Sequence, residues 1–173
     1  MERLFTRWGK ALDKNLPLND YPRPQMKRDS FINLNGEWNY AILDKFKKFN
    51  GYQGKITVPF SPECILSGVE KMVQPTDVLY YQRTFEFKRT NHRVLLHFGA
   101  VDYETTVYIN GKKAGYHKGG YASFKFDITD KTIEIQKIRE KFLRIPTVFL
   151  CCFIRIFIFI IKHNFPVFLL IQG

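Results

Sequence analysis

The sequence predicts an all-β protein built as an antiparallel β-sandwich. From residue 36 to residue 130, short stretches of alternating apolar and polar residues are separated by turn residues, which is typical of such a sandwich. Asn110-Gly111 is a strong signal for a tight hairpin, because both central residues of a type I′ turn need positive φ. The 173 residues suffice for one domain with a sizeable core.

Residues 1–35 are predicted to be an irregular approach to this sandwich. A short helix is expected within residues 4–12, ending before Pro17. Residues 21–25, which contain Pro22 and Pro24, should be extended because proline disfavours the α region in the residue before it. Trp38 opens the first strand and is expected in the core.

Residues 36–130 are predicted to hold seven strands. Two alternations are especially regular: Thr105, Val107 and Ile109 share one face of their strand, as the aromatic residues at 124 and 126 do in the last one. A long proline-containing loop separates the second and third strands. The predicted strands cover residues 37–43, 55–58, 78–88, 93–101, 104–109, 113–116 and 123–129.

The loop Gly119-Gly120-Tyr121 lies between the last two predicted strands. Paired glycines give the backbone conformations that other residues avoid, and an aromatic residue directly follows them. Such a surface suits a flat sugar ring. The alternative is a tight loop whose tyrosine serves packing alone.

Composition excludes several classes of function. The net charge is +11, but the basic residues form short pairs such as Lys47-Lys48 and Lys112-Lys113, without one basic stripe, so we expect no nucleic-acid partner. The three cysteines include no CxxC pair, and the four histidines have no metal-ligand spacing. No metal or cofactor is therefore expected. The start of the chain has no secretory signal, which favours the cytoplasm.

Residues 131–173 form a tail of different composition. Residues 131–144 are charged, and a helix is one expectation for them, while residues 145–171 are almost wholly apolar. Residues 145–161 approach the length of a membrane span, but Arg155 near their middle costs about 2.5 kcal/mol or more on insertion scales. A membrane helix, a packed helix and an out-of-frame apolar sequence that sticks to membranes remain alternatives. Membrane association through residues 145–171 is the alternative to a cytoplasmic location.

Several motifs together resemble one family. Five motifs follow one another along the chain in the family's order, and among them are the segments that contain Trp38, Gln82 and Ala100. They cover about residues 20–130 and resemble the N-terminal sugar-binding domain of glycoside hydrolase family 2, the β-galactosidase and β-glucuronidase group. The motifs are Tyr21-Pro22-Arg23-Pro24, Asn33-Leu34-Asn35-Gly36-Glu37-Trp38, Val58-Pro59-Phe60-Ser61-Pro62-Glu63, Tyr80-Tyr81-Gln82-Arg83-Thr84-Phe85, and Leu96-His97-Phe98-Gly99-Ala100-Val101-Asp102.

This resemblance implies a jelly-roll-like sandwich that is incomplete at its C-terminal end. The family continues with further strands, an immunoglobulin-like domain and a catalytic barrel, none of which is recognisable in residues 131–173. An exposed sheet edge and poor solubility, worse with the tail than without it, are expected consequences.

The resemblance also bears on the site. Retaining glycosidases need two carboxylates about 5–5.5 Å apart, which the family supplies from its barrel. No catalytic residue is therefore expected here. The resemblance implies that Gly119 stands where β-galactosidases of the family have an aspartate that contacts the sugar, and the Gly-Gly-Tyr sequence is closer to the β-glucuronidase side. The candidate sugar contacts are Asp102, Tyr103, Gly119, Gly120 and Tyr121.

Two functions follow from the sequence. One is the N-terminal sugar-binding part of a family 2 glycosidase, which hydrolyses O-glycosidic bonds, with no catalysis by this chain itself. Its partners would be a weakly bound carbohydrate and the missing catalytic domains. The alternative is a stand-alone carbohydrate-binding or interaction module, tethered to a membrane by its tail.

Overall fold

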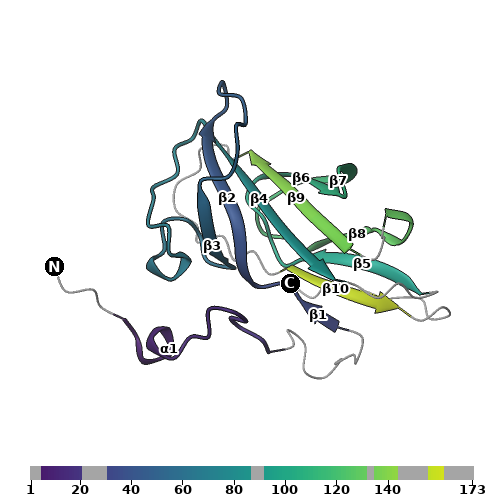
Figure 1. Ribbon diagram of the computed structural model, residues 1–173, viewed down its shortest axis with the longest axis horizontal. Helices are drawn as coiled ribbons and strands as arrows, with labels where there is room; N and C mark the ends of the chain where they lie inside the picture. The colour runs from purple at the N-terminus through teal and green to yellow at the C-terminus, as the bar shows by residue number, and fades with distance from the viewer. Residues whose placement is uncertain (1–4, 21–30, 87–91, 132–134, 144–155, 162–173) are drawn as a thin grey trace.

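The computed structural model describes residues 5–20, 31–86, 92–131, 135–143 and 156–161 (Figure 1). These residues form two antiparallel β-sheets that enclose one apolar core. The predicted all-β sandwich is thereby confirmed. The motif Tyr21-Pro22-Arg23-Pro24 lies outside the described residues.

The larger sheet has six strands in the order β3-β2-β4-β9-β6-β7, and the smaller has four in the order β1-β10-β5-β8. The larger sheet comprises β2 (Gly36–Asp44), β3 (Gly54–Val58), β4 (Asp77–Glu86), β6 (Glu104–Ile109), β7 (Lys112–Lys118) and β9 (Ile135–Leu143). The smaller sheet comprises β1 (Phe31–Asn33), β5 (Arg93–Phe98), β8 (Phe124–Asp127) and β10 (Ile156–Ile161). Each of the seven predicted strands corresponds to one of these, with ends that differ by a few residues.

The core forms where the inward faces of the two sheets meet. The predicted face of β6 is buried, since Thr105, Val107 and Ile109 are all below 1% exposed. Trp38 on β2 is 1% exposed, and its indole N–H donates a hydrogen bond to the Leu34 carbonyl at 2.8 Å. The expectation that this tryptophan belongs to the core is confirmed.

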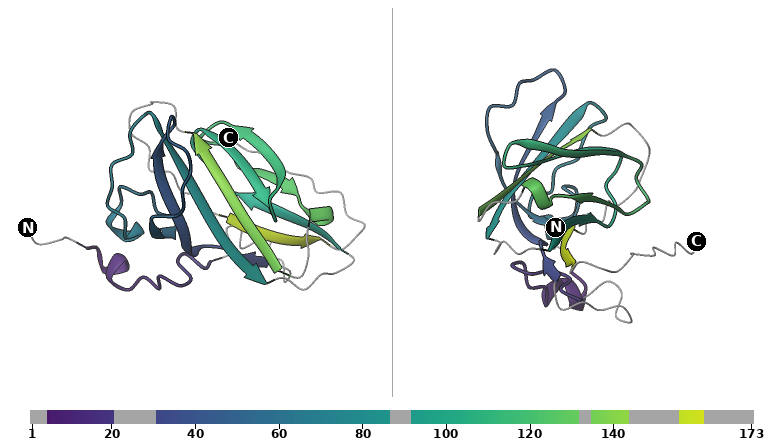
Figure 2. Two further views of the ribbon diagram at one scale, coloured as in Figure 1. Left: turned by 45° about the horizontal axis from the view of Figure 1, so that its top comes forward. Right: turned by 90° about the vertical axis from the view of Figure 1, so that its right-hand side faces the viewer.

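The N-terminal segment is largely irregular, as expected. Its helical part is the single turn α1 (Arg7–Lys10), which the Thr6 hydroxyl caps by accepting the Gly9 N–H at 3.1 Å. The segment then runs along the sandwich, where the Asn35 side chain donates to the Pro17 carbonyl at 3.1 Å. The second of these hydrogen bonds joins the segment to the residue before β2, and Figure 2 shows the segment, in purple, at one end of the sandwich.

Two short 3₁₀ turns, η2 (Ile65–Ser67) and η3 (Thr129–Lys131), complete the element list. The hairpin between β6 and β7 turns at Asn110 (φ 50°) and Gly111 (φ 81°), as the dipeptide predicts. Next to it, Gly115 on β7 leaves room for the Phe126 ring of the other sheet, because a Cβ at this position would overlap that ring.

The tail differs from its prediction. Residues 135–143 form strand β9 instead of a helix, and β9 pairs with β4 on one side and β6 on the other. Residues 156–161 form strand β10, which pairs with β1 and β5 (Figure 1). The sheets thus extend beyond residues 36–130 in both directions. The reason is long-range pairing, since both strands lie between neighbours that are distant in sequence.

Two further expectations concern the location of the chain in the cell. No helix among the described residues has the length and apolar character needed to cross a bilayer, and most of residues 145–171 lie outside the described ranges. Cys64 is a free thiol. The cytoplasmic location and the membrane alternative both remain predictions.

Candidate functional site

The candidate site forms where two loops meet at one end of the β6–β7 hairpin. Glu104, the first residue of β6, is paired in register with Lys118, the last residue of β7. The residues just before β6 and just after β7 are therefore neighbours in space. Asp102 and Tyr103 lie in the first of these loops, and Gly119-Gly120-Tyr121 lies in the second.

Direct contacts join the two loops. The Gly119 N–H donates to the Tyr103 carbonyl at 2.8 Å, and Gly119 itself has φ +133°, a conformation that favours glycine. A Cβ built on Gly120 would lie 2.8 Å from the nearer carboxylate oxygen of Asp102. The Asp102 carboxylate thus rests against the glycine backbone, and the structure brings four of the five predicted residues into contact.

Tyr121 presents its side chain to solvent. It is 80% exposed, so its ring does not serve the core. A large exposed aromatic side chain beside a glycine-lined backbone is suited to stack against the apolar face of a sugar ring, with a carboxylate nearby to accept hydrogen bonds from hydroxyl groups.

An ion pair borders these loops. The Lys118 ammonium lies 3.0 Å from a Glu104 carboxylate oxygen and 5.4 Å from the centre of the Tyr103 ring. The hydrogen bond and negative charge of Glu104 raise the pKa of Lys118, with smaller contributions from Tyr103 and Tyr116. This pair could not be predicted from the hairpin, because a regular turn at Asn110-Gly111 would place Glu104 opposite His117. The β-bulge between Val107 and Tyr108 shifts the register by one residue and brings Lys118 there instead.

His117 also lies at this site, although the sequence did not predict it there. Its ring stacks on Phe124, with centroids 4.0 Å apart and an interplanar angle of 14°. Its Nε2 atom is buried, has no hydrogen-bond partner among the described residues, and lies 3.6 Å from the Cβ position of Gly119. The imidazole therefore lies between the Phe124 ring and the backbone of Gly119.

Two further glutamates, Glu37 and Glu63, have structural partners. Glu37 pairs with Lys55 at 2.9 Å, and a Glu63 carboxylate oxygen accepts the Val73 N–H at 3.3 Å. Within the part of the chain that the structure describes, no cluster of three or more His, Cys, Asp or Glu side chains is arranged to hold a metal ion.

An open hollow of about 450 Å³ lies elsewhere, between α1 and η2. Apolar side chains, two lysines and one glutamate line it. It is separate from the candidate site, which is a pair of surface loops. The lining residues are Phe5, Gly9, Lys10, Lys14, Ile65, Leu66, Gly68 and Glu70.

Comparison with known proteins identifies the relatives of this fold. Residues 62–139 match the family described as glycosyl hydrolases family 2, sugar binding domain, and the matched stretch contains all five candidate site residues. A β-galactosidase of Thermoanaerobacter pseudethanolicus is 31% identical over 112 residues, which cover 61% of this chain and 15% of that protein. A protein named as a β-glucuronidase, from Formosa agariphila, is 51% identical over 118 residues, which cover 68% of this chain and 11% of that protein.

A solved structure agrees with this relationship at the level of the fold. The β-glucuronidase of an uncultured Clostridium superposes with a TM-score of 0.54 and 23% identity, covering 67% of this chain and 23% of that one. The predicted resemblance to the family 2 sugar-binding domain is confirmed. The chain spans less than a sixth of the length of the curated relatives it matches.

Proposed function

From its likeness to the sugar-binding domain of family 2 glycosidases, we propose that this chain binds carbohydrate through the two loops at the end of the β6–β7 hairpin. The observation that supports this most directly is the contact between Asp102 and Gly120 beside the exposed ring of Tyr121. All three residues lie within the stretch that matches the family.

Each part of the loop pair has a role in this proposal. The Tyr121 ring stacks on the C–H face of a sugar, and the Asp102 carboxylate accepts hydrogen bonds from its hydroxyl groups. Gly119 and Gly120 have no side chains, so the sugar can approach the backbone closely. Tyr103 fixes the first loop to the second through its carbonyl, which accepts the Gly119 N–H. Because few groups contact the sugar and the site is open, the affinity should be weak.

We further propose that the chain does not hydrolyse glycosides by itself and works with the catalytic domains of a family 2 glycosidase. Retaining hydrolysis needs an acid and a nucleophile about 5–5.5 Å apart. Glu37 and Glu104 are each paired with a lysine, and Glu63 holds a backbone N–H. These three glutamates therefore have structural partners, and in this proposal the acid and the nucleophile come from other domains.

The binding part is tested by titrating the purified chain with methyl β-galactoside and methyl β-glucuronide while recording amide NMR shifts. We expect shifts confined to residues around 102–104 and 118–121. Tyr121→Ala should weaken binding about fivefold, since stacking on an aromatic ring contributes on the order of 1 kcal/mol. Tyr116→Ala, which removes another exposed tyrosine on β7, is the matched control and should bind normally.

The catalytic part is tested separately with nitrophenyl galactosides and glucuronides. We expect no release of nitrophenol above that of a mock preparation from the same host. Hydrolysis that co-purifies with the chain and is lost in a Glu104→Gln variant would contradict the proposal. Unchanged amide shifts at every sugar concentration would contradict the binding part alone.

A further inference from the structure

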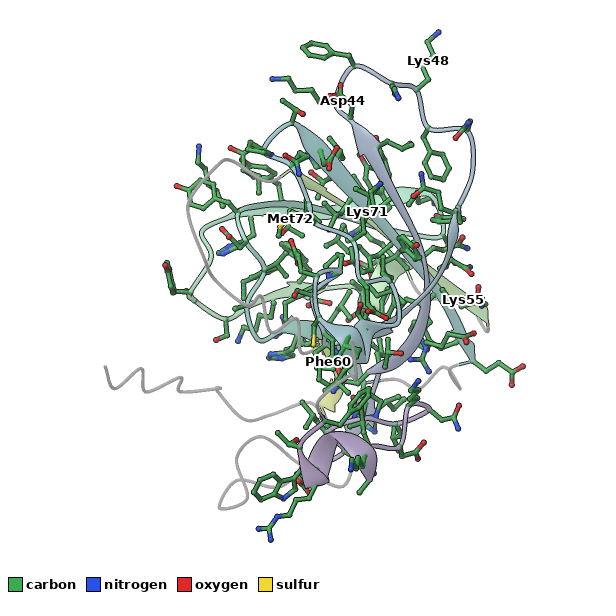
Figure 3. The ribbon with its side chains drawn as sticks, turned by 90° about the vertical axis from the view of Figure 1, so that its left-hand side faces the viewer. Asp44, Lys48, Lys55, Phe60, Lys71 and Met72 are labelled. Carbon is green, nitrogen blue, oxygen red and sulfur yellow. The ribbon has the colours of Figure 1, made fainter. Side chains whose placement is uncertain are left out.

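The loop between β2 and β3 is a second surface feature, unrelated to the sugar site. It covers residues 45–53 and contains three lysines, Lys45, Lys47 and Lys48, interleaved with Phe46 and Phe49. Figure 3 shows this loop projecting from the body of the molecule, with Asp44 at its base and Lys48 at its far end. We call residues 45–49 the basic tip.

Hydrogen bonds give the base of this loop a defined shape. An Asp44 carboxylate oxygen accepts the Phe46 N–H at 2.9 Å, and the Asp44 carbonyl accepts the Lys47 N–H at 2.9 Å. On the returning side, the Gln53 side chain bonds both the N–H of Ile42 (3.0 Å) and its carbonyl (3.2 Å). The hydrogen bonds of Asp44 and Gln53 therefore fix the base of the loop from which the basic tip projects.

The two phenylalanines of the basic tip have different surroundings. Phe49 packs on Tyr52 and Tyr80, with ring centroids 5.1 and 4.9 Å away. Phe46 is 84% exposed, and the Lys45 ammonium lies 5.0 Å from the centre of its ring. Phe46 thus leaves a large apolar surface in water beside the Lys45 ammonium.

This arrangement fits one kind of partner. Small-molecule sites are concave, whereas the basic tip is convex. A single free ring also differs from the several stacking aromatics along a basic groove that bind nucleic acid strands. A bilayer with anionic headgroups offers both complements, because its surface attracts lysines and its interfacial region takes up an apolar side chain.

We propose that the basic tip docks this chain on an anionic lipid surface, with Phe46 inserted between headgroups and the three lysines against the phosphates and carboxylates. β3 and β7 are the opposite edges of the larger sheet. The β2–β3 loop and the sugar-binding loops lie at the same end of this sheet but toward opposite edges of it, with β4, β9 and β6 between β2 and β7. The proposal is independent of the sugar-binding function.

The test is co-sedimentation of the full chain with vesicles of equal parts phosphatidylserine and phosphatidylcholine, and with vesicles of phosphatidylcholine alone. We expect binding to the anionic vesicles that weakens as salt is added. Each lysine near such a surface changes the partition coefficient about fivefold, so Lys45→Gln/Lys47→Gln/Lys48→Gln should bind about a hundredfold more weakly. Phe46→Ser should bind about tenfold more weakly.

Matched controls separate the effect of the basic tip from that of positive charge in general and of exposed apolar side chains in general. Lys112→Gln/Lys113→Gln/Lys125→Gln removes three exposed lysines from β7 and β8, and Met72→Ser removes an exposed apolar side chain (69% exposed). Both should bind like the parent chain. Parent-level binding by either basic-tip variant, or equal binding to the two kinds of vesicle, would overturn the proposal, and circular dichroism verifies that every variant is folded.

Discussion

Gly120 has a specific steric role in the candidate site. An alanine there would place its Cβ 2.8 Å from an Asp102 carboxylate oxygen, which is closer than Cβ atoms approach other heavy atoms in folded proteins. The aspartate side chain can rotate away at little cost, so Gly120→Ala should change the free energy of unfolding by less than about 0.5 kcal/mol. Sugar affinity should nevertheless fall several-fold, because the carboxylate leaves its place.

NMR titration of the Gly120→Ala variant, beside thermal unfolding, measures both quantities. Ala122→Ser changes an exposed residue of the same loop and is the control. If Gly120→Ala binds sugar like the parent chain, Asp102 has no part in the site.

Asp127 ties the end of β8 to β5 and gives stability a pH dependence. Its burial works to raise the pKa, but hydrogen bonds from Thr129 and from Arg93, whose Nη2 lies 2.7 Å away, outweigh this and lower the pKa below 3.8. A carboxylate with a lowered pKa stabilises the fold above its unfolded-state pKa, and this stabilisation is lost as the pH falls through its folded-state value.

We therefore expect Asp127→Asn to lower the urea midpoint at pH 7 and to have little effect at pH 2. The loss at pH 7 should stay below about 1 kcal/mol, because the side chain is 41% exposed and screened by solvent. Urea unfolding of both chains across this range checks the sign, and Asp130→Asn is the control. An equal loss at both pH values would show that packing, and not charge, is responsible.

At the level of residues, part of the candidate site could be predicted from the sequence. The glycine pair and the tyrosine were identifiable because each has a local conformational or chemical signature. The contacts of His117 with Phe124 and of Lys118 with Glu104 were not, since they depend on which strands pair and on how two loops approach each other.

Among the elements, the β6–β7 hairpin is coupled to the second sheet through Gly115. A Cβ at this position would overlap the Phe126 ring on β8. Gly115→Ala should therefore destabilise the chain by about 1–3 kcal/mol, the usual cost of overpacking a filled core. The double variant Gly115→Ala/Phe126→Leu should recover part of this loss, because leucine takes up less of the contested space.

Thermal or urea unfolding of the two single variants and the double variant measures this coupling. Additive losses would mean that Gly115 and Phe126 do not compete for the same space.

The elements also show where local patterns are informative. Strands β2 to β8 alternate in polarity and end at turn residues, so their positions could be predicted. In β9, apolar residues at 135, 138 and 142 have helical spacing, and in β10 an unbroken apolar run fits either a strand or a helix. The pairing of each with two neighbouring strands decides the outcome, and such long-range pairing is not visible in a local window.

For the whole molecule, the position of β9 and β10 inside the sheets changes what the C-terminal residues are expected to do. β9 bridges β4 and β6, and β10 bridges β1 and β5. Without them, the larger sheet would separate into β3-β2-β4 and β6-β7, and β1 would lose its partner. The sequence alone suggested that the chain would be more soluble without residues 131–173, whereas the structure favours the opposite.

This difference can be tested with two shortened chains. A chain that ends after Lys131 retains the carbonyl that accepts the Asn110 side-chain N–H at 3.1 Å, but it lacks both strands, and it should lose cooperative unfolding and aggregate through its open sheet edges. A chain that ends after Ile161 retains β9 and β10 and should melt like the full chain. Circular dichroism melts and sedimentation of both measure the effect. In the shorter chain, β4 and β6 each lose their pairing with β9, and β5 loses its pairing with β10. If a chain of 131 residues were nevertheless soluble and melted cooperatively, the sandwich would be complete without these two strands.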